Sequence, residues 1–399
     1  MKTDATDGDA IAGVRPRAAY APATLEECAE VMAEAARDRL RLGFIGGGTA
    51  LGLGAPPRGL DAVVRTARLG RIIEHAPADQ VVVVEAGVTL AALQAALGAH
   101  GQRLALDPPW PARATIGGLV ATGGFGPLRA RYGAIRDLII GVTLVLADGT
   151  VARGGGKVVK NVAGFDLPKV ACGSLGTLGM IAAAAFRLHP LPEQATTVLA
   201  GALRPEQVVA LVAAARAAQL EPTCVVALGT GASFDLALRF EGFGRGVDHQ
   251  VARMVDIARA TGAPAEPLAD DAAAVFWRRH DAVRTAGPLR MRVAALPTQL
   301  PAVAGWLAGL GTLAWYATLG LGIAAGAVAS GAAAAAAVIT ARAALASGGG
   351  SLVIEDAPAA LAGVDPWGPP PASFPVMQRL KRRFDPDGRL NPGRFVGGL

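Results

Sequence analysis

The sequence DPPWPARATIGGLVATGGFGPLRARYGAIRDLIIGVTLVLADG, residues 107–149, decides the fold class of this chain. It opens with a Pro-Pro-Trp-Pro run at residues 108–111, which restricts the backbone angles and removes amide donors. Glycines then recur among small residues, and glycine lets a backbone lie flat against a ligand because no Cβ holds the ligand away. The apolar run 138–146 predicts a buried strand that ends in a tight turn. We therefore expect a strand system that carries a glycine-lined concavity for an elongated, phosphate-bearing molecule.

A second glycine run lies upstream, directly after a strand that we predict at 42–45. Its letters, GGGTA, occupy residues 46–50. Backbone N–H groups of such a run are free to converge on phosphate oxygens, with the Thr49 hydroxyl as a further donor. The spacing fits neither the dinucleotide fingerprint GxGxxG nor a Walker A loop. For the segment 107–149, tight turns in a glycine-rich chain, in which 52 of 399 residues are Gly, are the alternative interpretation.

The composition is that of a globular protein with more than one domain. Hydrophobic residues make up 52% of the 399 positions and charged residues 18%, which predicts two or three domains around large cores. The net charge of +6 is mild and aromatic residues are only 5%, so we expect no nucleic-acid partner. Cys28, Cys172 and Cys224 are odd in number and far apart, which argues against a disulfide framework or a cluster. With no apolar segment at the N-terminus, the sequence predicts a cytoplasmic protein.

The stretch 293–340 contains no charged side chain and so satisfies a crude rule of length for a transmembrane helix. Prolines and glycines divide it into shorter pieces, however, and we predict no transmembrane span. The expected elements are a helix at 299–307, strands at 313–319 and 321–328, a helix at 332–346 and a strand at 351–355.

Other segments show clear element patterns. Thr24 and Glu27 form a capping box that begins a helix ending near residue 39. Thr89 caps another helix. Further expected elements are strands at 61–66, 71–75, 81–86 and 182–188, a helix at 90–100, and in the middle of the chain a strand at 196–202, a helix at 206–219 and a strand at 223–228.

Several motifs follow one another in an order that resembles a known protein family. GGGT is followed by TIGG-x2-AT-x-G-x-G, then by KNVAGFDLPKVACGSLGTLGMI at 160–181, and finally by DPDGRLNPG at 385–393. This series resembles the FAD-binding domain of the vanillyl-alcohol oxidase type. The segment 160–181 is similar to the smaller flavin subunit of bacterial glycolate oxidases.

The resemblance implies a set of residues that hold FAD. Residues 46–50 would bind the pyrophosphate, and the second glycine run would line the pyrophosphate, ribityl and ring portions. Ile181 would touch the adenine end through its backbone, and Asn391 would approach the isoalloxazine. The full set is Gly46, Gly47, Gly48, Thr49, Ala50, Pro108, Thr115, Ile116, Gly117, Gly118, Ala121, Thr122, Gly124, Ile181 and Asn391. Relatives with covalent flavin place a His in or just after the first glycine loop, whereas this chain reads TALGLG there. The expectation is therefore non-covalent FAD.

The resemblance also implies an α+β fold with four parts. These are a flexible tail at 1–14, a two-subdomain FAD-binding domain at 15–190, an α/β cap domain at 191–370 and a C-terminal segment at 371–399 that returns to the FAD-binding domain. We expect the cap to be an antiparallel sheet with helices on one side. Self-sufficient hydroxy-acid dehydrogenases of this kind carry a metal-binding histidine pair and a GDGN-x-H run in the cap, and this chain has neither. We expect no metal.

The sequence indicates the cofactor but does not identify the catalytic residues. Arg129, Arg131, Lys157 and Lys160 are basic candidates near the flavin segments, but no catalytic base can be named. The resemblance implies a subunit of a glycolate oxidase that works with a catalytic flavin subunit and an iron–sulfur subunit on a small 2-hydroxy acid. Alternatives are a stand-alone FAD-linked oxidase for another 2-hydroxy acid or a sugar acid, and a non-catalytic assembly subunit. Docking of such a complex at the inner face of the cell membrane is left open.

Overall fold

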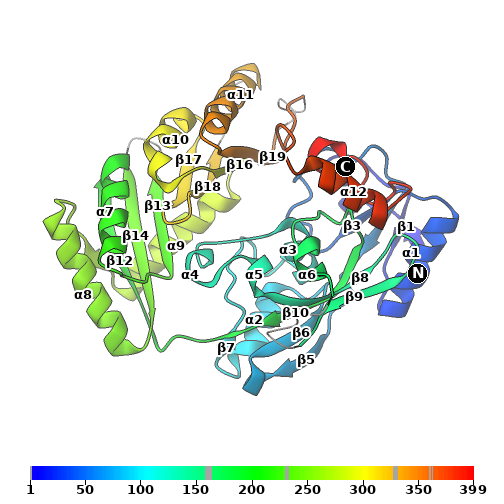
Figure 1. Cartoon of the computed structure of the whole chain (residues 1–399), viewed down its shortest axis with the longest axis horizontal. Helices are drawn as coiled ribbons and strands as arrows, with labels where there is room; N and C mark the ends of the chain where they lie inside the picture. Colours follow the sequence, from blue (N-terminus) through cyan, green and yellow to red (C-terminus); the bar gives the residue numbers. More distant parts are fainter. Residues whose placement is uncertain (1, 158–163, 230–232, 327–330, 359–360, 362) are drawn as a thin grey trace. The chain divides into compact units, whose positions relative to one another are not determined.

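The chain divides into two compact units in a computed structural model (Figure 1). The structure describes residues 2–157, 164–229, 233–326, 331–358, 361 and 363–399. Unit 1 comprises Met1–Gly126, Gly133–Leu191 and Pro369–Leu399, and unit 2 comprises Pro127–Tyr132 and Pro192–Gly368. The short piece Pro127–Tyr132 thus packs with unit 2, although the sequence analysis places it inside the FAD-binding domain.

Unit 1 contains a small, mostly parallel sheet. Its order is β1-β2-β4-β3, with β1 (Lys2–Asp4), β2 (Ala18–Tyr20), β3 (Leu42–Ile45) and β4 (Ala62–Arg65). Strand β4 pairs parallel with both β2 and β3. Helix α1 (Leu25–Arg37) is capped by the Thr24 hydroxyl, as predicted, and buries Cys28, Val31 and Met32 against the sheet.

The N-terminal segment is part of this subdomain, so the expectation of a flexible tail at residues 1–14 was wrong. Strand β1 pairs with β2, and Ile11 is fully buried. The carboxylate of Asp9 is buried and accepts two hydrogen bonds from Arg65, at 2.7 and 2.5 Å. A buried ion pair and one strand hold this segment in place.

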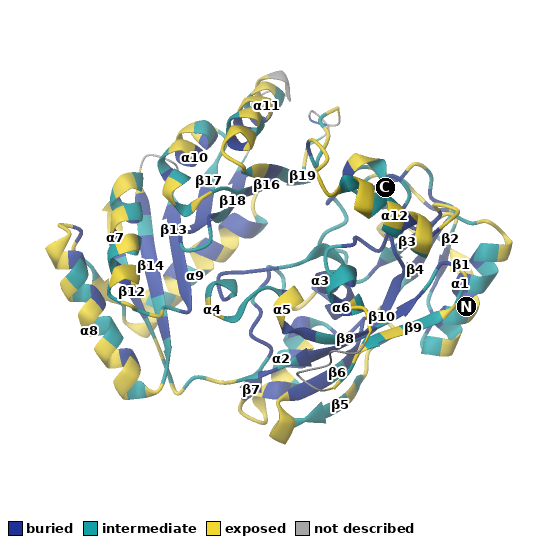
Figure 2. Ribbon diagram, in the orientation of Figure 1, coloured by how far each residue is buried: buried dark blue, intermediate teal, exposed yellow. Residues whose placement is uncertain are grey.

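A second sheet in unit 1 is five-stranded and entirely antiparallel. Its order is β5-β6-β10-β8-β9, with β5 (Ile72–Ala76), β6 (Val81–Glu85), β8 (Ile139–Val145), β9 (Val151–Gly155) and β10 (Met180–Arg187). Helices α2 (Leu90–Gly98), α3 (Ile116–Thr122), α5 (Ile135–Leu138) and α6 (Leu167–Ala171) share a core with one of its faces. The central strands are buried and the outer strand β5 is more exposed (Figure 2).

Unit 2 is built on an eight-stranded antiparallel sheet. Its order is β15-β12-β14-β13-β17-β18-β16-β19. The strands are β12 (Gln194–Leu203), β13 (Cys224–Gly229), β14 (Phe234–Gly242), β15 (Glu266–Pro267), β16 (Leu289–Ala294), β17 (Thr312–Tyr316), β18 (Leu321–Gly326) and β19 (Ser351–Asp356). Helices α7 (Pro205–Ala217), α8 (Gly244–Ala260), α10 (Leu300–Leu307) and α11 (Gly331–Ser347) share one large core with the sheet.

Helix α9 (Asp270–Thr285) corrects the expectation that all helices of this domain lie on one side. Val198 on β12 faces the large core, so its neighbour Thr197 points to the opposite face. The Trp277 indole of α9 donates to the Thr197 hydroxyl at 3.0 Å. Helix α9 therefore covers the second face of the sheet.

The fold class is the predicted α+β arrangement, and the element pattern of the uncharged stretch is confirmed as α10, β17, β18, α11 and β19. Within the described residues, no helix combines the length and the apolar character that crossing a membrane requires. The first four residues of the segment KNVAGFDL, 160–163, lie outside the described part of the chain.

Candidate functional site

The loop at residues 46–50 follows β3 and presents unused backbone donors. No N–H group of these five residues donates a hydrogen bond to any residue that the structure describes. Gly48 has φ +69°, a left-handed conformation that only glycine adopts at little cost. Backbone donors that are half-buried and lack an internal acceptor are suited to an anionic ligand.

The second glycine run lies directly against this loop. A Cβ on Gly46 would stand 2.1 Å from the Thr115 hydroxyl oxygen, and a Cβ on Gly47 would stand 1.6 Å from the Arg113 carbonyl oxygen. Both approaches are possible only for glycine. The two runs, far apart in sequence, therefore come together as the sequence analysis expected.

Much of the second run is a helix rather than an open loop. Thr115 caps α3, and its hydroxyl accepts from the Gly118 amide at 3.4 Å. Gly117 faces away from the first loop, because a Cβ there would stand 2.7 Å from the Cβ of Ala86. The other face of α3, with Gly118, Ala121 and Thr122, lines a cavity.

One cavity gathers ten of the fifteen residues that the sequence analysis singled out. These are Gly46, Gly47, Gly48, Thr49, Ala50, Thr115, Gly118, Ala121, Thr122 and Asn391. The other five, Pro108, Ile116, Gly117, Gly124 and Ile181, are not among the residues that line it.

The places of the outlying residues have structural reasons. The amides of Ile116 and Gly117 donate to the carbonyls of Val88 and Ala86, which ties the start of α3 to the segment that follows β6. Gly124 donates to the Leu119 carbonyl and closes the end of the same helix. Ile181 lies in β10, paired with Leu144 and buried. Pro108 is also buried.

The C-terminal segment forms one wall of the cavity. Asn391 has φ +44°, donates its amide N–H to the Leu42 carbonyl at 2.7 Å and donates its side-chain Nδ2 to the Leu175 carbonyl at 2.7 Å. Its Oδ1 is buried and has no hydrogen-bond partner among the described residues. A buried acceptor in this position is satisfied when a ligand supplies a donor.

A buried cation anchors this segment to the rest of unit 1. Lys381, in α12 (Phe374–Phe384), donates to the Asp385 carboxylate at 2.7 Å and to the carbonyls of Thr177 and Leu390 at 2.8 and 2.9 Å. Burial lowers the pKa of Lys381, and the Asp385 carboxylate opposes that shift. The segment is thereby held beside β3.

Six further lining residues escaped the sequence analysis. They are Phe44, Leu51, Leu119, Leu175, Gly176 and Arg394. Arg394 directly follows the LNPG motif, so its position was visible in sequence, but nothing in that motif shows that its side chain turns toward residues 51–55.

The basic candidates from the sequence do not line this cavity. Arg131 forms an ion pair with Glu221 at 3.1 Å, and Arg129 lines a different cavity, both within unit 2. Lys157 pairs with Glu74, and Lys160 lies outside the described residues. An exposed cation beside the glycine loop is Arg113, which donates to the Gly47 carbonyl at 3.4 Å.

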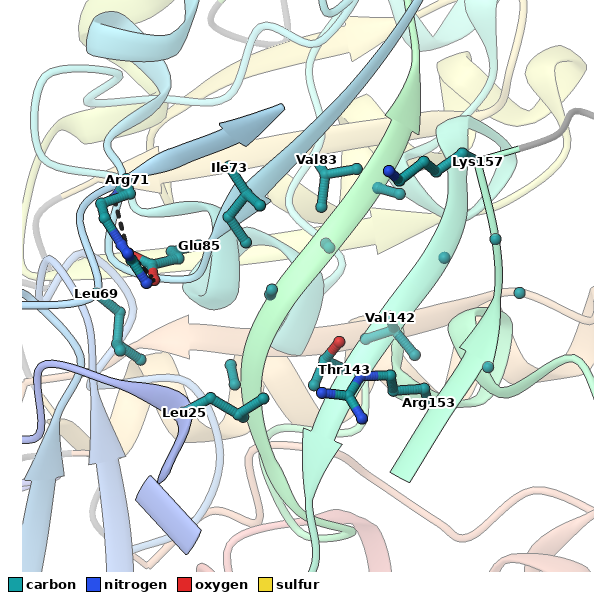
Figure 3. Close-up of a pocket in the computed structure, with 18 of the residues that line it drawn as sticks. Leu25, Leu69, Arg71, Ile73, Val83, Glu85, Val142, Thr143, Arg153 and Lys157 are labelled. Atoms are coloured by element: carbon teal, nitrogen blue, oxygen red, sulfur yellow. Dashed lines mark hydrogen bonds and ion pairs between the residues drawn. The ribbon is translucent and has the colours of Figure 1, made fainter. Parts of the chain in front are cut away.

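A larger cavity of about 590 Å³ lies on the other face of the five-stranded sheet (Figure 3). It is lined by the third glycine run, Gly154 to Gly156, and by Lys157. Arg71 and Glu85 form an ion pair there at 2.8 Å. The backbone groups of the inner strands β8 and β10 are engaged in the sheet ladder, so this face offers few free amides for a phosphate. The cavity at residues 46–50 is the better candidate site.

Reactive side chains are few. Burial raises the pKa values of Cys28 and Cys172 to about 12, which keeps both thiols protonated and unreactive. Among the described residues, no group of three or more His, Cys, Asp or Glu side chains is placed to hold a metal ion. The site therefore has the character of a binding cradle.

Comparison with known proteins agrees with this geometry. Residues 16–155 match the FAD binding domain family. Glycolate oxidase subunit GlcE of Escherichia coli (strain K12) is 35% identical over 174 residues, which are 43% of this chain and 48% of that protein. Glycolate oxidase subunit GlcD of Bacillus subtilis (strain 168) is 33% identical over 185 residues, 46% of this chain and 39% of that protein. D-lactate dehydrogenase of Archaeoglobus fulgidus is 35% identical over 184 residues, 44% of this chain and 41% of that protein.

The matched region therefore spans about half the length of these relatives, or less. A solved structure of alkyldihydroxyacetonephosphate synthase extends the likeness in fold to 96% of this chain and 78% of its own, with a TM-score of 0.71 at 18% identity.

The residues present fit FAD. Free amides at 46–50 suit its pyrophosphate, the glycines permit close approach, and the orphaned Oδ1 of Asn391 supplies an acceptor. The chain contains an FAD binding domain of the vanillyl-alcohol oxidase type, and FAD is its cofactor. Over this domain it is similar to subunits of glycolate oxidases and to hydroxy-acid dehydrogenases.

Proposed function

We propose that this chain is the FAD-binding subunit of a glycolate oxidase complex. In that role it takes part in the oxidation of glycolate to glyoxylate and in electron transfer to an iron–sulfur subunit. The observation that carries the proposal is the cavity of unit 1, in which free amides and the Asn391 acceptor surround a glycine-lined cradle. The similarity to GlcE and GlcD supports this choice of complex.

The chemistry explains why a partner is needed. Oxidation of a 2-hydroxy acid removes two electrons and two protons, and it needs a clamp for the carboxylate and a base for the hydroxyl proton. FAD, when bound, accepts the electron pair. The residues that line the cavity at residues 46–50 include no His, Asp, Glu, Lys or Tyr side chain as a candidate base. We therefore place substrate oxidation on a catalytic flavin subunit of the same complex.

We propose that the FAD is bound non-covalently. Covalent attachment requires a nucleophilic side chain such as His, Cys or Tyr, and none lines the cavity of unit 1. After acid precipitation of the yellow protein, the colour is expected in the supernatant. Colour that stays with the pellet contradicts this proposal.

The decisive experiment compares the chain alone with the reconstituted complex. The purified chain is expected to show a flavin absorbance spectrum that anaerobic glycolate does not bleach. Addition of the catalytic flavin and iron–sulfur subunits is expected to permit bleaching. Rapid bleaching of the isolated chain would assign the substrate chemistry to this chain itself.

The second candidate is a stand-alone FAD-linked oxidoreductase for another 2-hydroxy acid or a sugar acid. The similarity to D-lactate dehydrogenase of Archaeoglobus fulgidus favours it. Such a protein turns over alone with a dye acceptor. A non-catalytic assembly subunit, by contrast, purifies colourless and does not take up FAD.

We place the complex in the cytoplasm, and its contact with the inner face of the membrane, where present, is made through partners.

A further inference from the structure

Arg394 joins the C-terminal segment to the chain that follows the first glycine loop. Its Nη2 donates to the carbonyls of Leu51 and Leu53, at 2.8 and 2.5 Å, and its Nε donates to the carbonyl of Ala55 at 3.4 Å. The Ala55 amide returns a hydrogen bond to the Arg394 carbonyl at 3.1 Å. One guanidinium group thus holds three converging carbonyls in an irregular stretch that has no strand partner.

This arrangement carries a large desolvation cost. Arg394 is 3% exposed, and burial lowers its pKa to about 10. A buried guanidinium is tolerated only where hydrogen bonds replace its water. Its planar fork of donors matches several acceptors at once, which the single ammonium of lysine cannot do. The position therefore demands arginine specifically.

The same residue is connected to both walls of the cavity. Arg394 itself lines the cavity, and its amide donates to the carbonyl of Asn391, whose side chain holds Leu175. On the other side, Leu53 donates its amide to the Ala50 carbonyl at 3.2 Å, the last residue of the glycine loop. A displacement of residues 51–55 is therefore transmitted to the amides at 46–50.

We propose that Arg394 is a positioning residue for FAD: by clamping the carbonyls of residues 51–55, it fixes the direction of the unused amides at 46–50. The inference rests on the proposed flavin role of this cavity. Arg394 acts through the glycine loop, and it makes pyrophosphate binding depend on the docking of the C-terminal segment. Loss of the guanidinium loosens the loop before it unfolds unit 1.

Arg389 offers a matched control from the same segment. It is also buried and donates to three backbone carbonyls, those of Ala35, Leu40 and Ala147. None of these three residues lines the cavity. Arg389→Met and Arg394→Met therefore remove comparable buried contacts, and only the second removes contacts to the loop.

The test measures FAD affinity and local protection in the full chain. FAD is titrated into deflavinated protein, and hydrogen exchange of residues 46–55 is followed without FAD. Arg394→Met is expected to raise the FAD Kd by about tenfold or more and to speed exchange in this stretch. Arg389→Met is expected to lower the melting temperature by a similar amount and to leave the Kd within about twofold. Arg394→Lys is expected to recover part of the affinity, because it keeps one charged donor.

The outcomes separate this inference from the proposed function. If wild-type protein takes up no FAD, the flavin role fails. If wild-type protein binds FAD and Arg394→Met binds it equally well, or both Met variants weaken binding equally, the positioning role of Arg394 is overturned. Should Arg394→Met not fold, the ratio of Kd values for Arg394→Lys and wild type decides. Unchanged loop exchange together with unchanged affinity in Arg394→Lys would count against the inference.

Discussion

Gly47 leaves almost no room for a side chain, since an added Cβ would overlap the backbone carbonyl of Arg113 at 1.6 Å. We predict that Gly47→Ala weakens FAD binding by about 30-fold or more. The added methyl group forces the two glycine runs apart, and overpacking of this kind costs about 2 kcal/mol. Fluorescence titration of deflavinated protein with FAD measures the change.

Gly98 at the end of α2 is the control for this substitution. An added Cβ there meets nothing within 4 Å, and the residue has no positive φ. Gly98→Ala is expected to bind FAD as the wild type does. Equal affinities for Gly47→Ala and wild type would show that FAD does not depend on the contact of the two runs.

Arg113 supplies the exposed cation beside the same loop, with its Nη2 3.4 Å from the Gly47 carbonyl oxygen. We predict that Arg113→Ala raises the FAD Kd by about tenfold at low ionic strength, because a positive charge near a pyrophosphate is lost. Salt screens exposed charges, so the ratio of the two Kd values should shrink in about 1 M salt.

The exposed Arg253 on α8 in unit 2 is the comparison for Arg113. Arg253→Ala is expected to leave the FAD Kd unchanged at either salt concentration. A salt-independent loss of affinity in Arg113→Ala would point to the packing of its side chain and not to its charge.

Among the elements, the N-terminal segment shows how one buried pair fixes a polar stretch. Hydrogen bonding from Arg65 lowers the pKa of the Asp9 carboxyl to about 2, from 3.8. A carboxyl with a lowered folded-state pKa stabilises the fold above its unfolded pKa, and this stabilisation is lost as the pH falls through the folded value. The pair thus contributes about 2 kcal/mol at neutral pH and progressively less from about pH 4 down to pH 2.

We predict that Asp9→Asn lowers the free energy of unfolding by about 2 kcal/mol at pH 7, and that the two proteins converge near pH 2. Urea unfolding of both proteins across this pH range measures the difference. Asp7→Asn is the control, because Asp7 pairs with Arg15 in an exposed position, where such pairs contribute little. A constant difference between Asp9→Asn and wild type at all pH values would contradict the role of the ionised carboxyl.

The sequence predicted well those helices and strands whose ends are marked by local features such as a capping residue, a proline or a glycine. Helix α1 begins at its Thr24 cap, and β18 and α11 emerge from an uncharged stretch because prolines and glycines divide it. Helix α3 was missed, since two glycines in its first turns lower its helix propensity. Its stability comes from the Thr115 cap and from bonds to the carbonyls of Ala86 and Val88, which no local pattern encodes.

At the scale of the whole molecule, some residues of the candidate site could be predicted from the sequence and others could not. The glycine runs were visible because close approach of backbones leaves a strong compositional mark. Arg394 was not, because its role depends on which carbonyls it reaches across more than three hundred residues of chain. Ile181 does not line the cavity. Its motif contributes Leu175 and Gly176 to the lining, while Ile181 itself lies in the buried strand β10, so its expected backbone contact with FAD stays a prediction.

The division into two units leads to the last prediction. The proposed FAD site lies in unit 1, so saturation with FAD should stabilise this unit by mass action. Four of the five tryptophans, Trp277, Trp306, Trp315 and Trp367, lie in unit 2. In Trp110→Phe protein, intrinsic fluorescence therefore reports unit 2 alone. At an FAD concentration of about 100 times Kd, we expect a calorimetric transition of unit 1 to rise by about 5–10 °C, while the fluorescence transition stays in place. A fluorescence transition that rises equally would mean that the two units unfold as one cooperative body.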